Sequence, residues 1–275
     1  PRPVAEWLAD RLGDAAWQLS PRLRHVLGRN LELVLEGTAP ALAPRGALRT
    51  YARYFLAAMR LSQCDLERAV GRVRWEDESP LDTSLERGRG AVLLSAHLGN
   101  WDVLGAALVA RFGALCVVAE PLQPRPVFEF YTRMRQRHGV TVAPVGDPGR
   151  APVEVLRGNG ILGVVVDRPF GRRQVEAACG AALLAVPSGA IRLALRHGAA
   201  LHAGFALCEP GGFRVQVGPD WGPQLRRLAT EPERLQQAAA LYAAALGAAI
   251  ARHPGQWCLL HPLSRCAALA ARDAA

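Results

Sequence analysis

His97 and Asp102 are the two residues of this sequence whose types and spacing best indicate chemistry. Both lie in the stretch Ala-Val-Leu-Leu-Ser-Ala-His-Leu-Gly-Asn-Trp-Asp, residues 91–102. On one continuous helix, residues five positions apart point about 140° away from each other, so the two side chains would not pair. A carboxylate that binds one imidazole nitrogen leaves the other free to take a proton from a hydroxyl group. The pair therefore predicts a general base, provided that the chain folds the two side chains together.

The surrounding residues predict a strand, a turn and a helix that would do this. Residues 91–96 form an apolar run, and helical periodicity follows residue 100. Gly99 permits a tight turn, Asn100 is a favourable N-cap, and the helix dipole favours a carboxylate in the first turn. We therefore expect His97 at the strand end with Asp102 within hydrogen-bond reach. The alternative is a strand-capping histidine and an unrelated aspartate at the start of a helix.

Strands and helices alternate from residue 90 onward. The expected strands are 91–96, 114–119, 140–145, 161–166, 200–207 and 213–217, and the expected helices are 101–112, 127–137, 151–157, 188–196 and 232–252. This alternation predicts an α/β fold with a central, mostly parallel sheet flanked by helices. The first 75 residues show helical spacing at 5–12, 23–35 and 48–61. We expect one domain over 1–275, with a helical N-terminal region (1–75) and an α/β catalytic core (86–265).

Three further charged residues follow expected strands. Glu120 follows the second strand, and Asp167 and Arg168 follow the fourth. Because the carboxyl ends of parallel strands meet at one edge of a sheet, either Glu120 or Asp167 could supply a second carboxylate to His97. Helix capping and ion pairing in loops are the alternative roles for both acids.

The composition favours contact with phosphate groups. The net charge is +9, and all 33 basic side chains are arginines, which a GC-rich coding sequence would also favour. A cationic surface suits an anionic membrane or a phosphopantetheine donor. Nucleic acid is disfavoured because no binding motif accompanies the charge and aromatic residues make up only 6% of the chain. The six cysteines contain no Cys-x-x-Cys pair and predict free thiols, and no histidine has metal-ligand spacing.

Residues 86–102 closely resemble the motif block of bacterial glycolipid acyltransferases. These are the lipid A lauroyl/myristoyl acyltransferase family and its phosphatidylinositol mannoside acyltransferase branch, which the Gly-Asn-Trp-Asp continuation resembles more. Thinner matches to family elements lie at residues 20–30, 118–124, 135–139 (Arg-x3-Gly), 163–168 and 254–257 (Pro-x-x-Trp). One departure lies between Gly180 and Pro187, where the family usually carries polar and basic residues and this chain has Ala-Ala-Leu-Leu-Ala-Val.

The resemblance implies a glycerolipid acyltransferase-like fold and transfer of a fatty acyl chain from an acyl thioester to a hydroxyl of a membrane glycolipid. His97 would be the general base and Asp102 its orienting carboxylate, with Asn100, Arg135 and Arg168 in substrate binding. The donor would be acyl-coenzyme A or acyl-carrier protein, with the mannoside branch favouring coenzyme A, and the reaction would need no cofactor or metal. An acyl thioesterase that uses the same base and a noncatalytic lipid-binding protein are the alternatives.

We expect the protein to act peripherally at the cytoplasmic face of the bacterial inner membrane, attracted to its anionic surface. No run approaches 18 consecutive apolar residues, which argues against a conventional membrane span within the sequence. Trp7, Leu8 and Leu12 could form a membrane-contacting face on a short amphipathic segment, or an ordinary packing face. The sequence opens at Pro1, so removal of a preceding anchor or leader is a further alternative.

Overall fold

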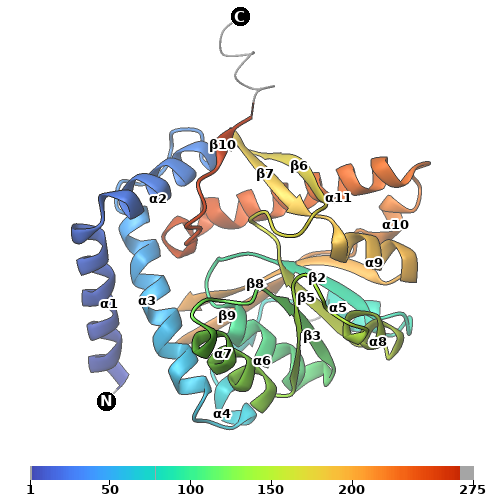
Figure 1. Cartoon of the computed structure of the whole chain (residues 1–275), viewed down its shortest axis with the longest axis horizontal. Helices are drawn as coiled ribbons and strands as arrows, with labels where there is room; N and C mark the ends of the chain where they lie inside the picture. Colours follow the sequence, from blue (N-terminus) through green and yellow to red (C-terminus); the bar gives the residue numbers. More distant parts are fainter. Residues whose placement is uncertain (1, 78, 267–275) are drawn as a thin grey trace, which may run out of the picture.

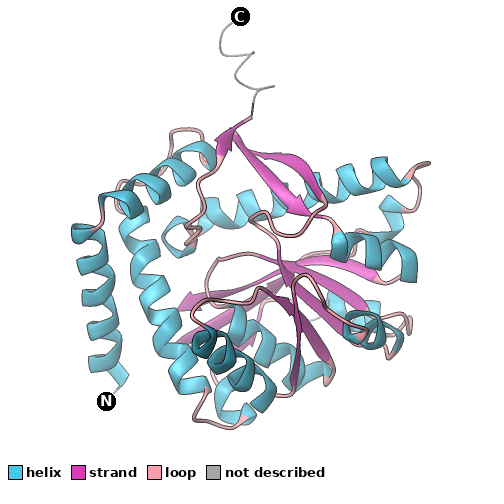
Figure 2. Ribbon diagram, in the orientation of Figure 1, coloured by secondary structure: helices cyan, strands magenta, loops and turns pink. Residues whose placement is uncertain are grey.

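Seven strands form the central sheet in the part of the chain that the structure, a computed structural model, describes (residues 2–77 and 79–266; Figures 1 and 2). They are β1 (Val73–Trp75), β2 (Ala91–Ser95), β3 (Leu115–Ala119), β4 (Val140–Pro144), β5 (Ile161–Val165), β8 (Ala200–Glu209) and β9 (Gly212–Val217). Their spatial order is β1-β9-β8-β2-β5-β3-β4, and each adjacent pair is parallel except β8 with β9. The α/β prediction is confirmed, and the six expected strands form within two residues of the expected bounds.

Helices cover both faces of this sheet. They are α5 (Ser79–Leu85), α6 (Trp101–Phe112), α7 (Arg125–Arg137), α8 (Ala151–Arg157), α9 (Gly189–His197), α10 (Gly222–Leu225) and α11 (Glu231–Arg252). Val92 and Leu94 of β2 pack on the side of α8, α9 and α11, whereas Ala91 and Leu93 pack on the side of α5 and α6. All five β2 side chains are buried because both faces are covered, which explains the continuous apolar run.

A second, three-stranded sheet was not expected from the sequence. It contains β6 (Gln174–Cys179), β7 (Ala182–Pro187) and β10 (Ser264–Arg265), in the order β10-β7-β6. Leu184 and Val186 are buried in the same core as Ala243 and Leu246 of α11. The apolar run that departs from the family pattern is therefore β7, and its side chains serve packing. β1 was also missed, since three residues with a half-buried pattern give too short a signal.

Three helices precede the sheet, as predicted, but they are longer than expected. They are α1 (Arg2–Leu19), α2 (Pro21–Val34) and α3 (Ala43–Leu61), followed by the short α4 (Leu66–Val70). In Figure 1, α1 and α3 run side by side at one end of the molecule. Their close approach depends on Gly13, because a Cβ there would lie 2.6 Å from the Cα of Arg49.

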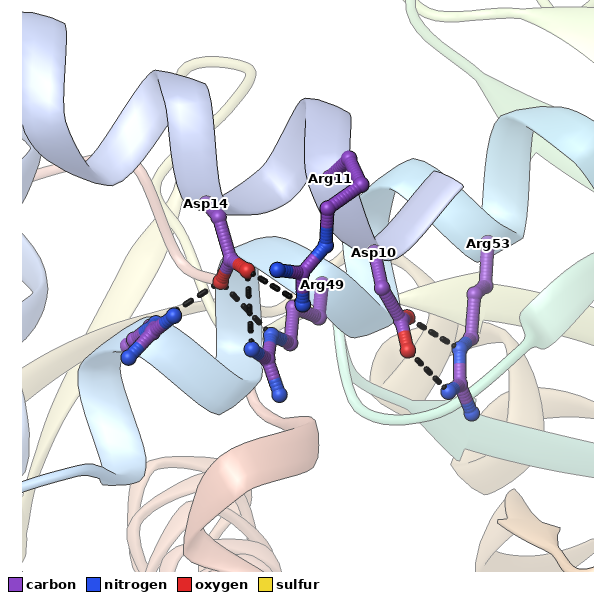
Figure 3. Close-up of polar contacts among 6 residues, drawn as sticks. Asp10, Arg11, Asp14, Arg49 and Arg53 are labelled. Carbon is purple, nitrogen blue, oxygen red and sulfur yellow. Dashed lines mark hydrogen bonds and ion pairs between the residues drawn. The ribbon is translucent and has the colours of Figure 1, made fainter. Parts of the chain in front are cut away.

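Acidic residues of α1 face arginines of α3 (Figure 3). Asp14 accepts from Arg45 Nε at 2.7 Å and from Arg49 Nε at 2.7 Å, while Asp10 accepts two bonds of 2.6 Å from Arg53. The hydrogen bonds from Arg49 and Arg45 hold the pKa of Asp14 well below its ordinary value. The polar side of α1 therefore docks on α3, and several arginines that raise the net charge are neutralised within the fold.

The apolar side of α1 consequently faces outward. Trp7 is 58% exposed and Leu12 is 68% exposed, and Val4, Leu8 and Leu19 are also exposed. The sequence left open whether Trp7, Leu8 and Leu12 form a membrane-contacting face or an ordinary packing face. The prediction of a packing face is wrong, because all three side chains are exposed. None of the helices in residues 2–77 and 79–266 has the length and apolar character that crossing a membrane requires.

Candidate active site

His97 lies in the turn between β2 and α6, as the sequence predicts. Gly99 adopts a φ of +67°, and a Cβ there would lie 2.0 Å from the carbonyl oxygen of Ala206. A side chain at this position would therefore push the turn away from β8. Asn100 is the N-cap of α6, and its Oδ1 accepts from the backbone N–H of Val103 at 3.0 Å. The buried Asn100 thus fixes the start of the helix, and its assignment to substrate binding stays a prediction.

The carboxylate that contacts His97 is Asp167. Its Oδ1 lies 2.7 Å from His97 Nδ1, and its Oδ2 accepts from the His97 backbone N–H at 2.9 Å. The paired register of Ser95 with Val165 explains this contact, because it brings the ends of β2 and β5 together. Since a carboxylate only accepts, Nδ1 carries the proton and Nε2 is free to accept one.

Asp167 is ionised although it is only 1% exposed. Burial alone would raise its pKa, but the charge of His97 and hydrogen bonds from His97 and Trp257 outweigh burial and hold the pKa of Asp167 below its ordinary value. The Trp257 bond runs from the indole Nε1 to Oδ2 at 2.9 Å. The imidazole itself keeps 23% of its side-chain surface exposed. The base is thus open on one side and held by a buried anion on the other.

The predicted hydrogen bond between His97 and Asp102 was wrong. Asp102 Oδ1 accepts from Arg135 Nε at 2.7 Å, and Oδ2 accepts from the Tyr54 hydroxyl at 2.6 Å. The start of α6 turns the Asp102 side chain toward α3 and α7, while the neighbouring Trp101 packs edge-on against His97 with ring centroids 5.0 Å apart. Asp102 therefore joins three helices behind the site and does not contact the base.

The ion pair between Asp102 and Arg135 is almost fully enclosed. The Asp102 side chain is 4% exposed and that of Arg135 is 15% exposed. Burial alone would lower the pKa of Arg135, but the charge of Asp102 and its hydrogen bond raise that pKa above its ordinary value. Burial, followed by the charge of Asp102, raises the pKa of Tyr54 well above its ordinary value, so the phenol stays protonated and donates. Arg135 was predicted to bind substrate, and here its guanidinium binds Asp102.

Glu120 and Arg168 pair with each other near the opening of the site. Glu120 follows β3 and Arg168 follows Asp167, so the strand-end placement is as expected. Their side chains form an ion pair, and no hydrogen bond between Glu120 and His97 occurs in the described residues. Of the two candidates for a second carboxylate, the structure thus brings Asp167 to His97. Both Glu120 and Arg168 line the adjoining cavity, and the substrate-binding assignment of Arg168 stays a prediction.

A cavity of about 330 Å³ opens beside His97. It lies between the sheet face formed by β2, β3 and β5 and the helices α3, α6 and α7. Its apolar lining includes Leu93, Leu104, Leu108, Leu115, Val117 and Met134. The site therefore places a polar base beside a mainly apolar cavity, an arrangement typical of pockets that bind an apolar ligand at one end and orient its polar group at the other.

Two residues of the site were not assigned a role from the sequence. Tyr54 lies on α3, 48 positions from Asp102, and no local pattern connects the two. Trp257 belongs to the Pro-x-x-Trp element, which pointed to a family feature without a contact. Both contacts depend on tertiary packing between distant segments.

Comparison with known proteins identifies the family. Residues 1–265 match the model of the bacterial lipid A biosynthesis acyltransferases. This chain belongs to that family. A phosphatidylinositol mannoside acyltransferase of Mycolicibacterium smegmatis is 32% identical over 244 residues, which cover 86% of this chain and 78% of that protein. The Mycobacterium tuberculosis (strain CDC 1551 / Oshkosh) protein of the same name is 32% identical over 251 residues, covering 86% and 75%. The resemblance seen in the motifs is confirmed, and membership makes the protein an acyltransferase of lipid biosynthesis.

Proposed function

We propose that this acyltransferase moves a fatty acyl chain from an acyl thioester to a hydroxyl group of a membrane glycolipid. The observation that carries the proposal is the position of His97, which is oriented by a buried carboxylate and opens onto an apolar cavity. Similarity to two phosphatidylinositol mannoside acyltransferases supports a glycolipid acceptor. Acyl-coenzyme A and acyl-carrier protein both fit as donors, because each presents the same thioester.

In this mechanism His97 first accepts a proton and later donates the same proton. Nε2 takes the proton of the acceptor hydroxyl as the hydroxyl oxygen attacks the thioester carbon. Asp167 holds the Nδ1–H tautomer and stabilises the imidazolium that forms. When the tetrahedral intermediate collapses, the carbon–sulfur bond breaks, the ester remains, and Nε2 returns the proton to the departing thiolate. Such proton transfer contributes about 10²–10⁴-fold in rate.

The cavity suits the acyl chain of the donor. Its apolar lining removes the chain from water, and burial of each methylene group contributes about 0.8 kcal/mol. With the chain enclosed between the sheet and α6, the thioester carbon would stand at the opening, beside the accessible edge of His97. Enclosing the chain also positions the reacting carbon, which is a large part of what an acyltransferase must do.

The acceptor decides between transfer and hydrolysis. We expect the release of free thiol from palmitoyl-coenzyme A or palmitoyl-acyl-carrier protein to depend on added glycolipid, with one acyl group gained per acceptor molecule. The measurement is thiol release with and without phosphatidylinositol mannoside, combined with mass spectrometry of the lipid. Equal thiol release without acceptor would indicate the thioesterase alternative. Binding of lipid without any thiol release would indicate a noncatalytic lipid-binding protein.

We also propose that the protein works peripherally at the cytoplasmic face of the bacterial inner membrane. The outward apolar side of α1, with Trp7, Leu8 and Leu12, supports insertion into the interfacial region of a bilayer. The net charge of +9 supports attraction to anionic lipids, and each arginine near the surface contributes about 1 kcal/mol. Because Arg45, Arg49 and Arg53 bind acids of α1, we expect apolar insertion to carry part of the affinity.

Sedimentation with anionic vesicles separates the two contributions. Wild-type binding should weaken as salt is raised, because salt screens charges over about 10 Å at 0.1 M. The part of the binding that comes from apolar insertion should remain at high salt. Leu8→Glu combined with Leu12→Glu should remove that remainder. Gln224→Glu combined with Gln237→Glu adds the same charge on α10 and α11, at the other end of the molecule, and should change binding less. Wild-type-like binding of the α1 variant at every salt concentration would contradict insertion.

A further inference from the structure

Trp257 contributes the third donor to a carboxylate that is closed off from water. Asp167 is 1% exposed, and its oxygens accept from His97 Nδ1, from the His97 backbone N–H and from Trp257 Nε1. Trp257 is itself 1% exposed. A buried carboxylate with no water depends on such donors, because each unmet acceptor leaves part of its charge without compensation.

The backbone around Trp257 is joined to the turn that carries His97. The N–H of Gly99 donates to the carbonyl of Gln256 at 3.0 Å, and the N–H of Cys258 donates to the carbonyl of His97 at 2.9 Å. These bonds flank Trp257 on both sides and form a bridge with Leu98. The indole is therefore fixed in relation to the same residues that place the imidazole.

This segment is anchored on its other side as well. The Gln256 side chain donates to the carbonyl of Cys208 at 2.9 Å and accepts from the N–H of Cys208 at 2.7 Å. The end of β8 thus holds the segment 256–258 against the catalytic turn. A side chain needed only to fill the core would not require its polar atom to meet the carboxylate of Asp167.

We propose that Trp257 is a positioning residue of the His97–Asp167 pair, whose indole N–H fixes Oδ2 so that Oδ1 stays directed at His97 Nδ1. The inference rests on the proposed function, in which His97 is the base. The indole N–H also places the positive end of a dipole against Asp167. Removing it makes the surroundings of His97 more negative and favours the imidazolium, so the variant should need a higher pH to reach the neutral base.

Other ionisable groups also face the pair, from α11, from the segment after Trp257 and from the lining of the cavity. Tyr242 of α11 and Cys258 face Asp167, and burial raises the pKa of Tyr242 well above its ordinary value and that of Cys258 to about 12. Around the cavity, Asp102 pairs with Arg135, and Glu120 pairs with Arg168. The other ionisable side chains of the lining are those of Tyr51, Tyr54, Tyr131 and His138. Because these groups are the same in the wild type and in a Trp257 variant, their effect on the pH dependence cancels when the two proteins are compared.

The first test is the pH dependence of kcat/KM for acyl transfer by Trp257→Phe, which keeps an aromatic ring but lacks the N–H. We expect its acid limb to move upward by about 0.5–1 pH unit. Trp221→Phe is the matched control, since Trp221 is 5% exposed in the same core and lies outside the cavity. The acid limb of the Trp221→Phe profile should coincide with that of the wild type. A Trp257→Phe limb at the wild-type position would overturn the proposal.

The second test begins with the wild-type protein and needs no substrate. Trp101 packs edge-on against His97 and can sense the imidazole directly, so the six indole N–H signals of the wild-type protein are first assigned. We expect the Trp257 signal to shift with pH at the midpoint of the His97 imidazole. In folded Asp167→Asn that coupled shift should be lost. A Trp257 signal that does not change as His97 titrates would overturn the proposal even if Trp257→Phe proved unstable. A wild type without transfer activity would count against the proposed function alone, because the indole titration is read without substrates.

Discussion

Asp167→Asn is expected to lower kcat for acyl transfer by about 10²–10⁴-fold while the protein stays folded. The amide keeps the size of the carboxylate but carries no charge, so it neither enforces the Nδ1–H tautomer of His97 nor stabilises the imidazolium. KM for the donor should change little, because Asp167 is buried behind the imidazole. The measurement is steady-state thiol release at saturating acceptor, with thermal unfolding recorded for each protein.

Asp147→Asn provides the control for that comparison. It makes the same chemical change at an exposed carboxylate in the loop after β4, which lies three strands from β2 in the sheet. Its kcat should stay near the wild-type value. If Asp167→Asn turned over as fast as Asp147→Asn, the buried carboxylate would have no part in the reaction, and the mechanism would lose its orienting group.

Arg135→Leu should destabilise the protein by about 3–5 kcal/mol, the largest change in stability that we expect from a single substitution. The change leaves the Asp102 carboxylate enclosed between α3, α6 and α7 and, within residues 2–77 and 79–266, with only the Tyr54 hydroxyl as a side-chain donor. An uncompensated buried charge costs much more than the loss of a surface ion pair. The free energy of unfolding from urea denaturation gives the value directly.

Arg133→Leu is the matched control for this loss. Arg133 lies on the same helix, its side chain is 70% exposed, and it approaches Glu129 at 3.6 Å. Exposed pairs of this kind contribute about 0–1 kcal/mol. Equal unfolding free energies for the two variants would mean that the Asp102–Arg135 pair does not hold the three helices together.

The elements around the base were predictable because their signals are local. Gly99 and Asn100 mark the turn and the N-cap, and the apolar run of β2 reports a strand covered on both faces. The β6–β7 hairpin lacked such a signal, since the short apolar run of β7 fits a buried strand or a piece of helix equally well. Gly180, with φ of +55° before β7, was the available turn marker.

The partner of His97 required knowledge of the sheet order. The five-residue spacing drew attention to Asp102, but α6 turns that side chain toward Arg135. Asp167 reaches His97 because β5 lies beside β2 in register, although the two residues are 70 positions apart. Strand-end placement brought Asp167 into the candidate set, and only the pairing of strands distinguishes it from Glu120.

The central claim, that His97 is the base of glycolipid acylation, is tested most directly by mass spectrometry of the lipid after parallel incubations of wild type and His97→Ala with acyl thioester and acceptor. Thermal unfolding of both proteins checks that equal amounts of folded protein are compared. The mechanism predicts a lipid heavier by one acyl group with the wild type, and at most about one hundredth of that amount with the variant. Equal amounts of acylated lipid from the two proteins would contradict the claim.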